Sequence, residues 1–264
     1  YNTAVGFQSL RGSTIASNNV GQYNTATGYQ SLVNNENGAR NTAIGYQALY
    51  SNTSGTRNTA VGYGALDANT TGYWNTAVGY DAVGTATNIQ NATGLGYLAQ
   101  PTSSNYIHIG NTSVLWIGGQ VTWSTYSDSR MKKNIKEDVN GLDFILNLRP
   151  VTNYFDKDKT DDIIGAEDES DYSEKYDIEK IKQSGFIAQE VYQAAQTAGY
   201  DFSGVKKPKG NTNYYSLSYA EFVVPLVKAV QEQQNEIVQL KEKVKEIDTL
   251  RKEIEELKSL LMQK

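Results

Sequence analysis

The chain has no cysteine and a single histidine, His108, among its 264 residues. The lack of Cys excludes disulfide scaffolds, thiolate zinc sites and cysteine nucleophiles, and one His cannot build a Ser-His-Asp triad or a multi-histidine metal centre. No apolar run approaches the roughly 20 residues that a membrane span needs. The net charge is -5, and an acidic balance of this kind argues against the clustered basic face that a nucleic-acid-binding protein needs. We therefore expect no metal, cofactor, membrane span or nucleic-acid partner.

Charge is almost missing from the first half of the chain. Residues 1–126 hold three cations and three anions, whereas residues 127–264 hold 21 cations and 26 anions. Glycine is distributed the other way, with 17 of the 23 before residue 127. This break in composition predicts a domain boundary near residues 120–130. No signal peptide opens the chain, and because residue 1 is Tyr we expect a fragment of a longer protein.

The uncharged half is an internal repeat. Segments such as YNTATGYQSL (23–32), RNTAIGYQAL (40–49) and WNTAVGYDAV (74–83) share one pattern, and their glycines recur at spacings of 22, 17, 17, 17 and 17. These glycines are Gly6, Gly28, Gly45, Gly62, Gly79 and Gly96. Such a short period indicates one unit stacked on itself, and 17 Gly- and Asn-rich residues do not form a helix pair.

Each repeat reads as a short Asn-Thr-Ala-Val strand, closed by Gly and followed by a polar turn. The recurring Ala indicates close approach of another backbone, and the recurring Gly a bend without room for a side chain. A disordered low-complexity tract is the alternative, but disorder would not keep the apolar positions in phase. The pattern resembles the head repeats of trimeric autotransporter adhesins, which implies left-handed parallel β-rolls in a trimer. We assign residues 1–105 to this stalk.

Residues 106–126 predict a β-rich neck of two or three short strands with a turn at Gly118-Gly119. His108 has no suitably spaced ligand partners and is interpreted as a structural residue. Trp116 and Trp123 are expected to pack in a core or along a trimer axis.

The boundary carries the strongest candidate chemistry, in the segment SDSRMKKNI at 127–135. Ser127 stands five residues before Lys132, with Arg130 and Lys133 nearby. A serine needs a base within hydrogen-bond reach, and a lysine serves when desolvation or neighbouring cations lower its pKa. Ser and Lys at this spacing also occur by chance in charged surface loops, so this pattern alone is weak.

A longer stretch resembles the intramolecular chaperone domain of endosialidases and phage tail spikes, a self-cleaving serine peptidase. The shared segments are SDSRMKKNIKED, GLDFILNLRPVTNYF, QSGFIAQEV (183–191) and YYSLSYAEFVVPLVKAVQEQQNEI (214–237). The resemblance implies that residues 127–264 drive trimerisation of the fibre and then cut the Tyr126–Ser127 bond. It assigns Ser127 as nucleophile and Lys132 as base, with Asp128 and Arg130 in supporting roles. Whether the attack occurs within one chain or across the trimer stays open.

The last segment, from about 226 to 264, predicts a long amphipathic helix. From Ile237 its apolar residues follow steps of 3 and 4, a heptad seam with one three-residue interruption at Ile247–Leu250. A trimeric coiled coil fits best, and a single helix packed on its own domain is the alternative. Pro225 is expected near a helix start or a kink.

Two further segments of the second half are interpreted as structural. Residues 156–179 are expected to be a solvated acidic insert. Asp156, Asp158, Thr160 and Glu167 have calcium-loop spacing, but Asp161 stands where the loop requires Gly. GFIAQEVYQAAQTAG predicts an amphipathic helix that packs on a core and ends near Gly199, so Gln189 and Glu190 do not indicate a second site.

The whole sequence predicts a parallel β-roll stalk followed by a mixed α+β chaperone domain that ends in a coiled coil. We expect a homotrimeric fibre of a virion tail or a bacterial surface, which meets a host glycan or receptor through its upstream part. One alternative is an uncleaved adhesin whose C-terminal domain is a permanent anchor. Another is a carbohydrate-active spike, disfavoured because the stalk carboxylates Glu36, Asp67 and Asp81 are scattered along the sequence.

Overall fold

A computed structural model of the chain describes residues 1–12, 20–166, 168, 170–209 and 213–262. These residues form two compact units, which we treat separately. The first consists of residues 1–121, 152–183 and 208–214, and the second of residues 122–151, 184–207 and 215–264.

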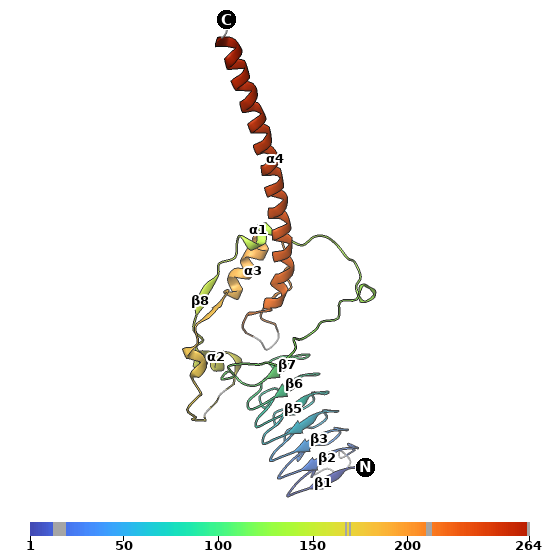
Figure 1. Ribbon diagram of the computed structural model, residues 1–264. Coiled ribbons are helices and arrows are strands. Elements are labelled where there is room, and N and C mark those ends of the chain that lie inside the picture. The colour runs from blue at the N-terminus through green and yellow to red at the C-terminus, as the bar shows by residue number, and fades with distance from the viewer. Residues whose placement is uncertain (13–19, 167, 169, 210–212, 263–264) are drawn as a thin grey trace. The chain divides into compact units, whose positions relative to one another are not determined.

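The first unit is built around a parallel β-solenoid (Figure 1). Its strands pair in chain order in one sheet, and Thr25, Thr42, Thr59 and Thr76 stand in register at successive coils. Strand formation at each Thr-Ala-Val segment confirms the prediction from the 17-residue repeat. The strands are β1 (Thr3–Val5), β2 (Thr25–Thr27), β3 (Thr42–Ile44), β4 (Thr59–Val61), β5 (Thr76–Val78), β6 (Thr93–Leu95) and β7 (Ile107–Ile109).

Small residues allow the coils to stack. The central Ala of strands β2 to β5, such as Ala43 and Ala60, is completely buried in the solenoid interior. The glycine that follows the strand has a φ that side chains rarely adopt, +136° at Gly45. A Cβ at Gly45 would lie 2.2 Å from the carbonyl oxygen of Gly62 in the next coil. Only Gly meets both conditions, which explains why it recurs in every repeat.

Two ladders of buried asparagines satisfy the backbone of the turns. In the first ladder, Asn41 Oδ1 accepts a hydrogen bond from the backbone N–H of Asn58 at 2.9 Å, and Asn41 Nδ2 donates to Gly55 O at 2.8 Å. In the second, Asn52 Nδ2 donates to Asn35 Oδ1 at 2.8 Å, and Asn69 Nδ2 to Asn52 Oδ1 at 2.9 Å. Buried amides that are hydrogen-bonded between coils in this way fix the register of the coils.

Aromatic side chains form a further ladder on the outside of the solenoid. Successive rings of this ladder lie 4.7 to 5.6 Å apart, and the inner pairs are nearly parallel. All of its members are at least one-third exposed. They are Phe7, Tyr29, Tyr46, Tyr63, Tyr80 and Tyr97.

The predicted neck forms one strand instead of two or three. That strand, β7, pairs with β6 as a continuation of the solenoid, and residues 111–126 have no strand. Trp116 and Trp123 are 80% and 89% exposed, so neither packs in a core formed by the described residues. The alternating apolar pattern therefore has no partner strand among the described residues of one chain, and extended backbone without a partner makes no ladder.

Several described residues of the acidic insert are buried, contrary to the prediction of a solvated segment. Helix α2 (Lys157–Ile164) begins after Asp156, whose side chain accepts a hydrogen bond from Lys159 N–H, and η3 (Asp177–Lys180) follows. Lys157 is fully buried and Asp161 nearly so. The residues at calcium-loop spacing therefore belong to a helix and its cap, apart from Glu167, which lies outside the described residues.

Helices dominate the second unit. It contains η2 (Ser129–Met131), α1 (Leu142–Ile145), α3 (Ala188–Thr197), η4 (Tyr219–Phe222) and α4 (Val223–Met262), with β10 (Val205–Lys206) paired to β11 (Ser216–Leu217). The short strands β8 (Val151–Asn153) and β9 (Gln183–Gly185) pair with each other. The core gathers Phe144, Phe202 and Phe222 around α3, whose Val191 and Ala194 are buried. The amphipathic helix predicted from GFIAQEVYQAAQTAG is confirmed.

Close approach of two backbones anchors α1 to the long helix. A Cβ on Gly141 would lie 2.8 Å from the backbone nitrogen of Ala229. The backbone N–H of Leu142 donates to Glu232 Oε2 at 2.7 Å, which places a carboxylate at the start of α1. The close approach of α1 to α4 therefore depends on a residue without a side chain at position 141.

Helix α4 is continuous over its 40 residues (Figure 1). Pro225 lies in its first turn, where the missing N–H costs nothing, as predicted. The seam residues are between 44% and 75% exposed, so the seam is not covered by the described residues of the chain. They are Leu226, Val230, Ile237, Leu240, Val244, Ile247, Leu250, Ile254, Leu257 and Leu261. Within the described residues, no helix has the length and apolar character needed to cross a bilayer.

Candidate active site

A short turn brings Ser127 and Lys132 together. The 3-10 helix η2 begins after Asp128 and ends at Met131, and the backbone N–H of the next residue, Lys132, bonds to Ser129 O at 3.2 Å. This turn folds the chain back so that Lys132 Nζ lies 2.8 Å from Ser127 Oγ. The pair therefore has the separation that proton transfer between a hydroxyl and an amine requires.

Asp128 and Arg130 hold the turn rather than reach the pair. The Asp128 carboxylate accepts a hydrogen bond from the backbone N–H of Arg130 at 2.8 Å. It also receives Arg130 Nε at 3.0 Å and Arg130 Nη2 at 2.6 Å. The hydrogen bonds from the Arg130 side chain and backbone lower the pKa of Asp128. These hydrogen bonds close the turn that lies between Ser127 and Lys132.

The environment of the pair is open. Ser127 and Lys132 are both exposed, and Tyr126, on the other side of the candidate scissile bond, is 93% exposed. Met131 and Ile135 beside them expose 66% and 72% of their surface. The bond between Tyr126 and Ser127 is thus accessible, and the exposed apolar side chains of Tyr126, Met131 and Ile135 lie close to the pair in the sequence.

Comparison with known proteins finds one protein family whose match to the chain begins at this turn. Residues 127–200 match the chaperone of endosialidase, a peptidase family. The match starts at Ser127, extends through α3 and stops before α4. No curated protein and no solved structure matches the chain. A parallel β-solenoid followed by a chaperone-of-endosialidase region indicates a fibre-type protein with an intramolecular chaperone.

The stalk carboxylates are closer together than their sequence positions suggest. Burial and then the charge of Asp67 raise the pKa of Asp81 to about 6, so the two carboxyl groups interact. Burial also raises the pKa of Asp67, and Asp67 Oδ1 is buried without a hydrogen-bond partner. The 17-residue coil brings these groups onto adjacent layers, which a linear reading of their spacing does not reveal.

His108 is half-buried in β7 opposite Gly94. Burial lowers the pKa of His108, and a hydrogen bond with the backbone of Gln100 opposes that shift. Among the described residues no cluster of three His, Asp or Glu side chains has the arrangement of a metal site.

Sequence reasoning missed the buried charges of the insert. Lys157, Asp161 and Asp168 lie together in the first unit, and Lys157 contacts both carboxylates. The available signal was the i, i+4 spacing of Lys157 and Asp161. That spacing is equally common on solvated helices, so it did not distinguish a buried pair from an exposed one.

Proposed function

We propose that the chain is part of a trimeric fibre or surface adhesin that matures by one self-cleavage. Residues 127–264 assemble and fold the solenoid and then cut the Tyr126–Ser127 bond. The observation that carries the proposal is the 2.8 Å contact between Lys132 Nζ and Ser127 Oγ, at the point where the family match begins.

The reaction follows from the positions of these two groups. Neutral Lys132 removes the proton from Ser127 Oγ, and this oxygen attacks the carbonyl carbon of Tyr126. The carbon–nitrogen bond breaks, and the nitrogen of Ser127 leaves as an amine with the proton from Lys132. Water then hydrolyses the Tyr126 ester, which gives a new carboxylate at Tyr126 and a free Ser127 amino terminus. Asp128 and Arg130 keep the turn in place during these steps.

Assembly supports the timing of this reaction. A lysine that acts as a base at neutral pH must be desolvated or crowded by cations. In the single chain Lys132 is exposed, and the adjacent Met131, Ile135 and Tyr126 are exposed too. Trimerisation through the exposed α4 seam would bring three such regions together and cover them.

Trimerisation also answers a folding difficulty of the stalk. Parallel coils depend on contacts 17 residues apart and on a register shared by three chains, which makes their folding slow. A C-terminal assembly element joins the three chains first, so that finding the register becomes an intramolecular search. Removal of that element afterwards leaves a stalk that is stable for kinetic reasons.

The test is the intact mass of the purified chain under denaturing conditions, beside Ser127→Ala and Lys132→Ala. We expect the parent to give residues 1–126 and 127–264, Ser127→Ala to stay whole, and Lys132→Ala to be slower by about 10²-fold or more. Ser129→Ala and Lys133→Ala are the matched controls, and both should cleave. A parent that assembles as a trimer but stays whole would instead identify the C-terminal domain as a permanent anchor.

A further inference from the structure

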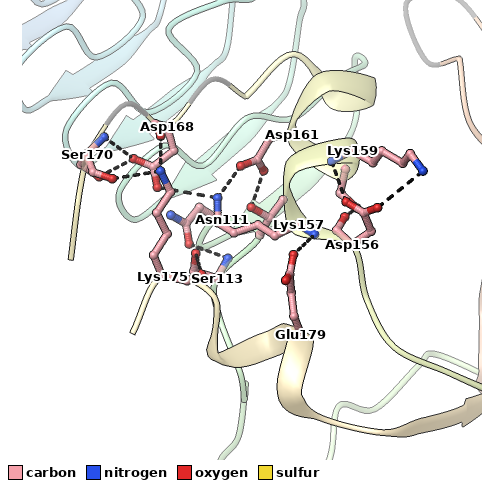
Figure 2. A network of polar contacts seen from close by, with 12 residues as sticks. Asn111, Ser113, Asp156, Lys157, Lys159, Asp161, Asp168, Ser170, Lys175 and Glu179 are labelled. Carbon is pink, nitrogen blue, oxygen red and sulfur yellow. Dashed lines mark hydrogen bonds and ion pairs between the residues drawn. The ribbon is translucent and has the colours of Figure 1, made fainter. Parts of the chain in front are cut away.

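A buried lysine lies at the centre of a polar network in the first unit (Figure 2). Lys157, at the start of α2, has no exposed side-chain surface. Its ammonium is hydrogen-bonded to Asp161, and its Nζ lies 3.9 Å from Asp168 Oδ2. A buried cation is stable only when carboxylates compensate its charge, and removal of one partner is strongly destabilising. The network is therefore a unit that depends on each of its members.

The same carboxylates bind the end of the solenoid. Tyr97 Oη, in the turn after β6, lies 2.8 Å from Asp168 Oδ1 and 2.9 Å from Ser170 Oγ. Thr112, directly after β7, donates its hydroxyl proton to Asp161. Each carboxylate that neutralises Lys157 thus also accepts a hydrogen bond from the solenoid.

Backbone groups extend this contact on both sides. Ser113 Oγ donates to the carbonyl oxygen of Lys175 at 3.0 Å. Lys175 Nζ in turn donates to the carbonyl oxygens of Asp168 and Ser170, at 2.5 and 2.9 Å. We call this set of contacts between the solenoid end (Tyr97, Thr112 and Ser113) and the insert residues Asp161, Asp168, Ser170 and Lys175 the junction.

The junction joins segments on opposite sides of the candidate scissile bond. Its solenoid residues precede Tyr126, and its insert residues follow Ser127. We propose that the junction is a noncovalent lock, which keeps the cleaved chaperone segment bound to the stalk, and that release is a second step separate from peptide-bond cleavage. This inference rests on the proposed self-cleavage and specifies how its products separate.

The chemistry of the junction suits a lock that can open. The contacts that cross it are hydrogen bonds, each of modest net strength, whereas an apolar interface of similar size would hold permanently. Because the Lys157 cluster fails when one partner is lost, disruption of a few contacts opens the whole junction. No additional reactant is needed, because cleavage itself removes the chain connection that otherwise returns the two surfaces to each other.

The test separates the lock from the self-cleavage. In the full chain carrying Ser127→Ala, a recognition sequence for a site-specific protease is placed between Gly118 and Gly119, which lie in the exposed neck. After complete cutting by the added protease, native size-exclusion chromatography with mass detection follows the two pieces. We expect them to co-elute. Immediate separation of the pieces would overturn the lock, whatever the outcome of the Ser127 experiment.

Variants then establish which contacts hold the pieces. Tyr97→Phe with Thr112→Val removes two hydrogen bonds to the carboxylates and should speed dissociation by roughly tenfold or more. Tyr63→Phe removes a hydroxyl from the same ring ladder, two coils before the junction, and should dissociate like the parent. Asp168→Asn is a second disrupting variant in case the double variant folds poorly, and the melting curve before cutting reports folding. Equal dissociation of parent and disrupting variants would overturn the assignment to these residues.

Discussion

Asp81 is a carboxyl group whose charged form is disfavoured in the folded stalk. Burial is the larger cause and the charge of Asp67 the smaller one, and together they raise the pKa of Asp81 from 3.8 to about 6. The folded stalk therefore binds more protons than the unfolded chain between those two pH values. The stability contributed by the protonated group is fully present below about pH 4 and is lost as pH rises through about 6.

Replacement of Asp81 by Asn should remove this dependence. We expect the parent to show a declining urea midpoint for stalk unfolding between pH 4 and pH 7, and Asp81→Asn to lose most of that decline and be more stable at pH 7. Glu36→Gln removes one stalk charge elsewhere and serves as the control for net charge. A parent whose midpoint rises over this range would contradict the direction of the shift.

Among the elements of the stalk, the second asparagine ladder stops before the solenoid does. Asn69 is completely buried, and its Oδ1 has no hydrogen-bond partner. The next position of the ladder, 17 residues on, is the partly buried Ala86. A buried acceptor without a donor costs about 1–3 kcal/mol, so the ladder ends at a weak point.

Ala86→Asn should extend the ladder by one step. Its Nδ2 would donate to Asn69 Oδ1, as Asn69 Nδ2 donates to Asn52 Oδ1, and we expect a gain of about 1 kcal/mol in the free energy of unfolding. Ala86→Ser, with a side chain too short to span the coils in this way, is the matched control. Equal unfolding midpoints for the Asn and Ser variants would show that the ladder does not continue.

The elements also show why prediction from sequence succeeded in some regions and failed in others. The strands were predictable because a fixed period aligns Ala43 with Ala60 whatever the details of the turns. Helix α4 was equally readable from its seam. The prediction of strands in the neck was wrong because alternation of apolar and polar residues around Trp116 indicates a strand only if a partner strand exists. The prediction of a solvated insert was wrong because the sequence shows the charges of Lys157 and Asp168 but not their burial.

The candidate site and the junction differ in the same way: the first could be predicted from the sequence and the second could not. Ser127 and Lys132 are close in sequence, so a single turn determines their contact and a short motif reveals it. The junction combines Tyr97, Thr112 and Asp168, which are brought together by the stacking of distant segments. No local pattern distinguishes Tyr97 from the tyrosines of earlier coils.

For the molecule as a whole, assembly should depend on the seam of α4. Leu240→Glu places a charge within the seam, and because charge is costly in a coiled-coil core we expect the trimer to be lost. Lys241→Glu changes charge beside the seam and should still form trimers. Light scattering of the Ser127→Ala background measures the mass without interference from cleavage. A trimeric Leu240→Glu chain would place the assembly surface elsewhere.

The outer ring ladder of the stalk also has an optical consequence. Tyr29, Tyr46 and Tyr63 are nearly parallel chromophores with centroids 5.1 and 4.7 Å apart. Transitions at such separations couple, and the resulting near-ultraviolet circular dichroism exists only while neighbouring coils are in register. The stalk therefore carries its own optical reporter of coil stacking, distinct from the helical signal of α4.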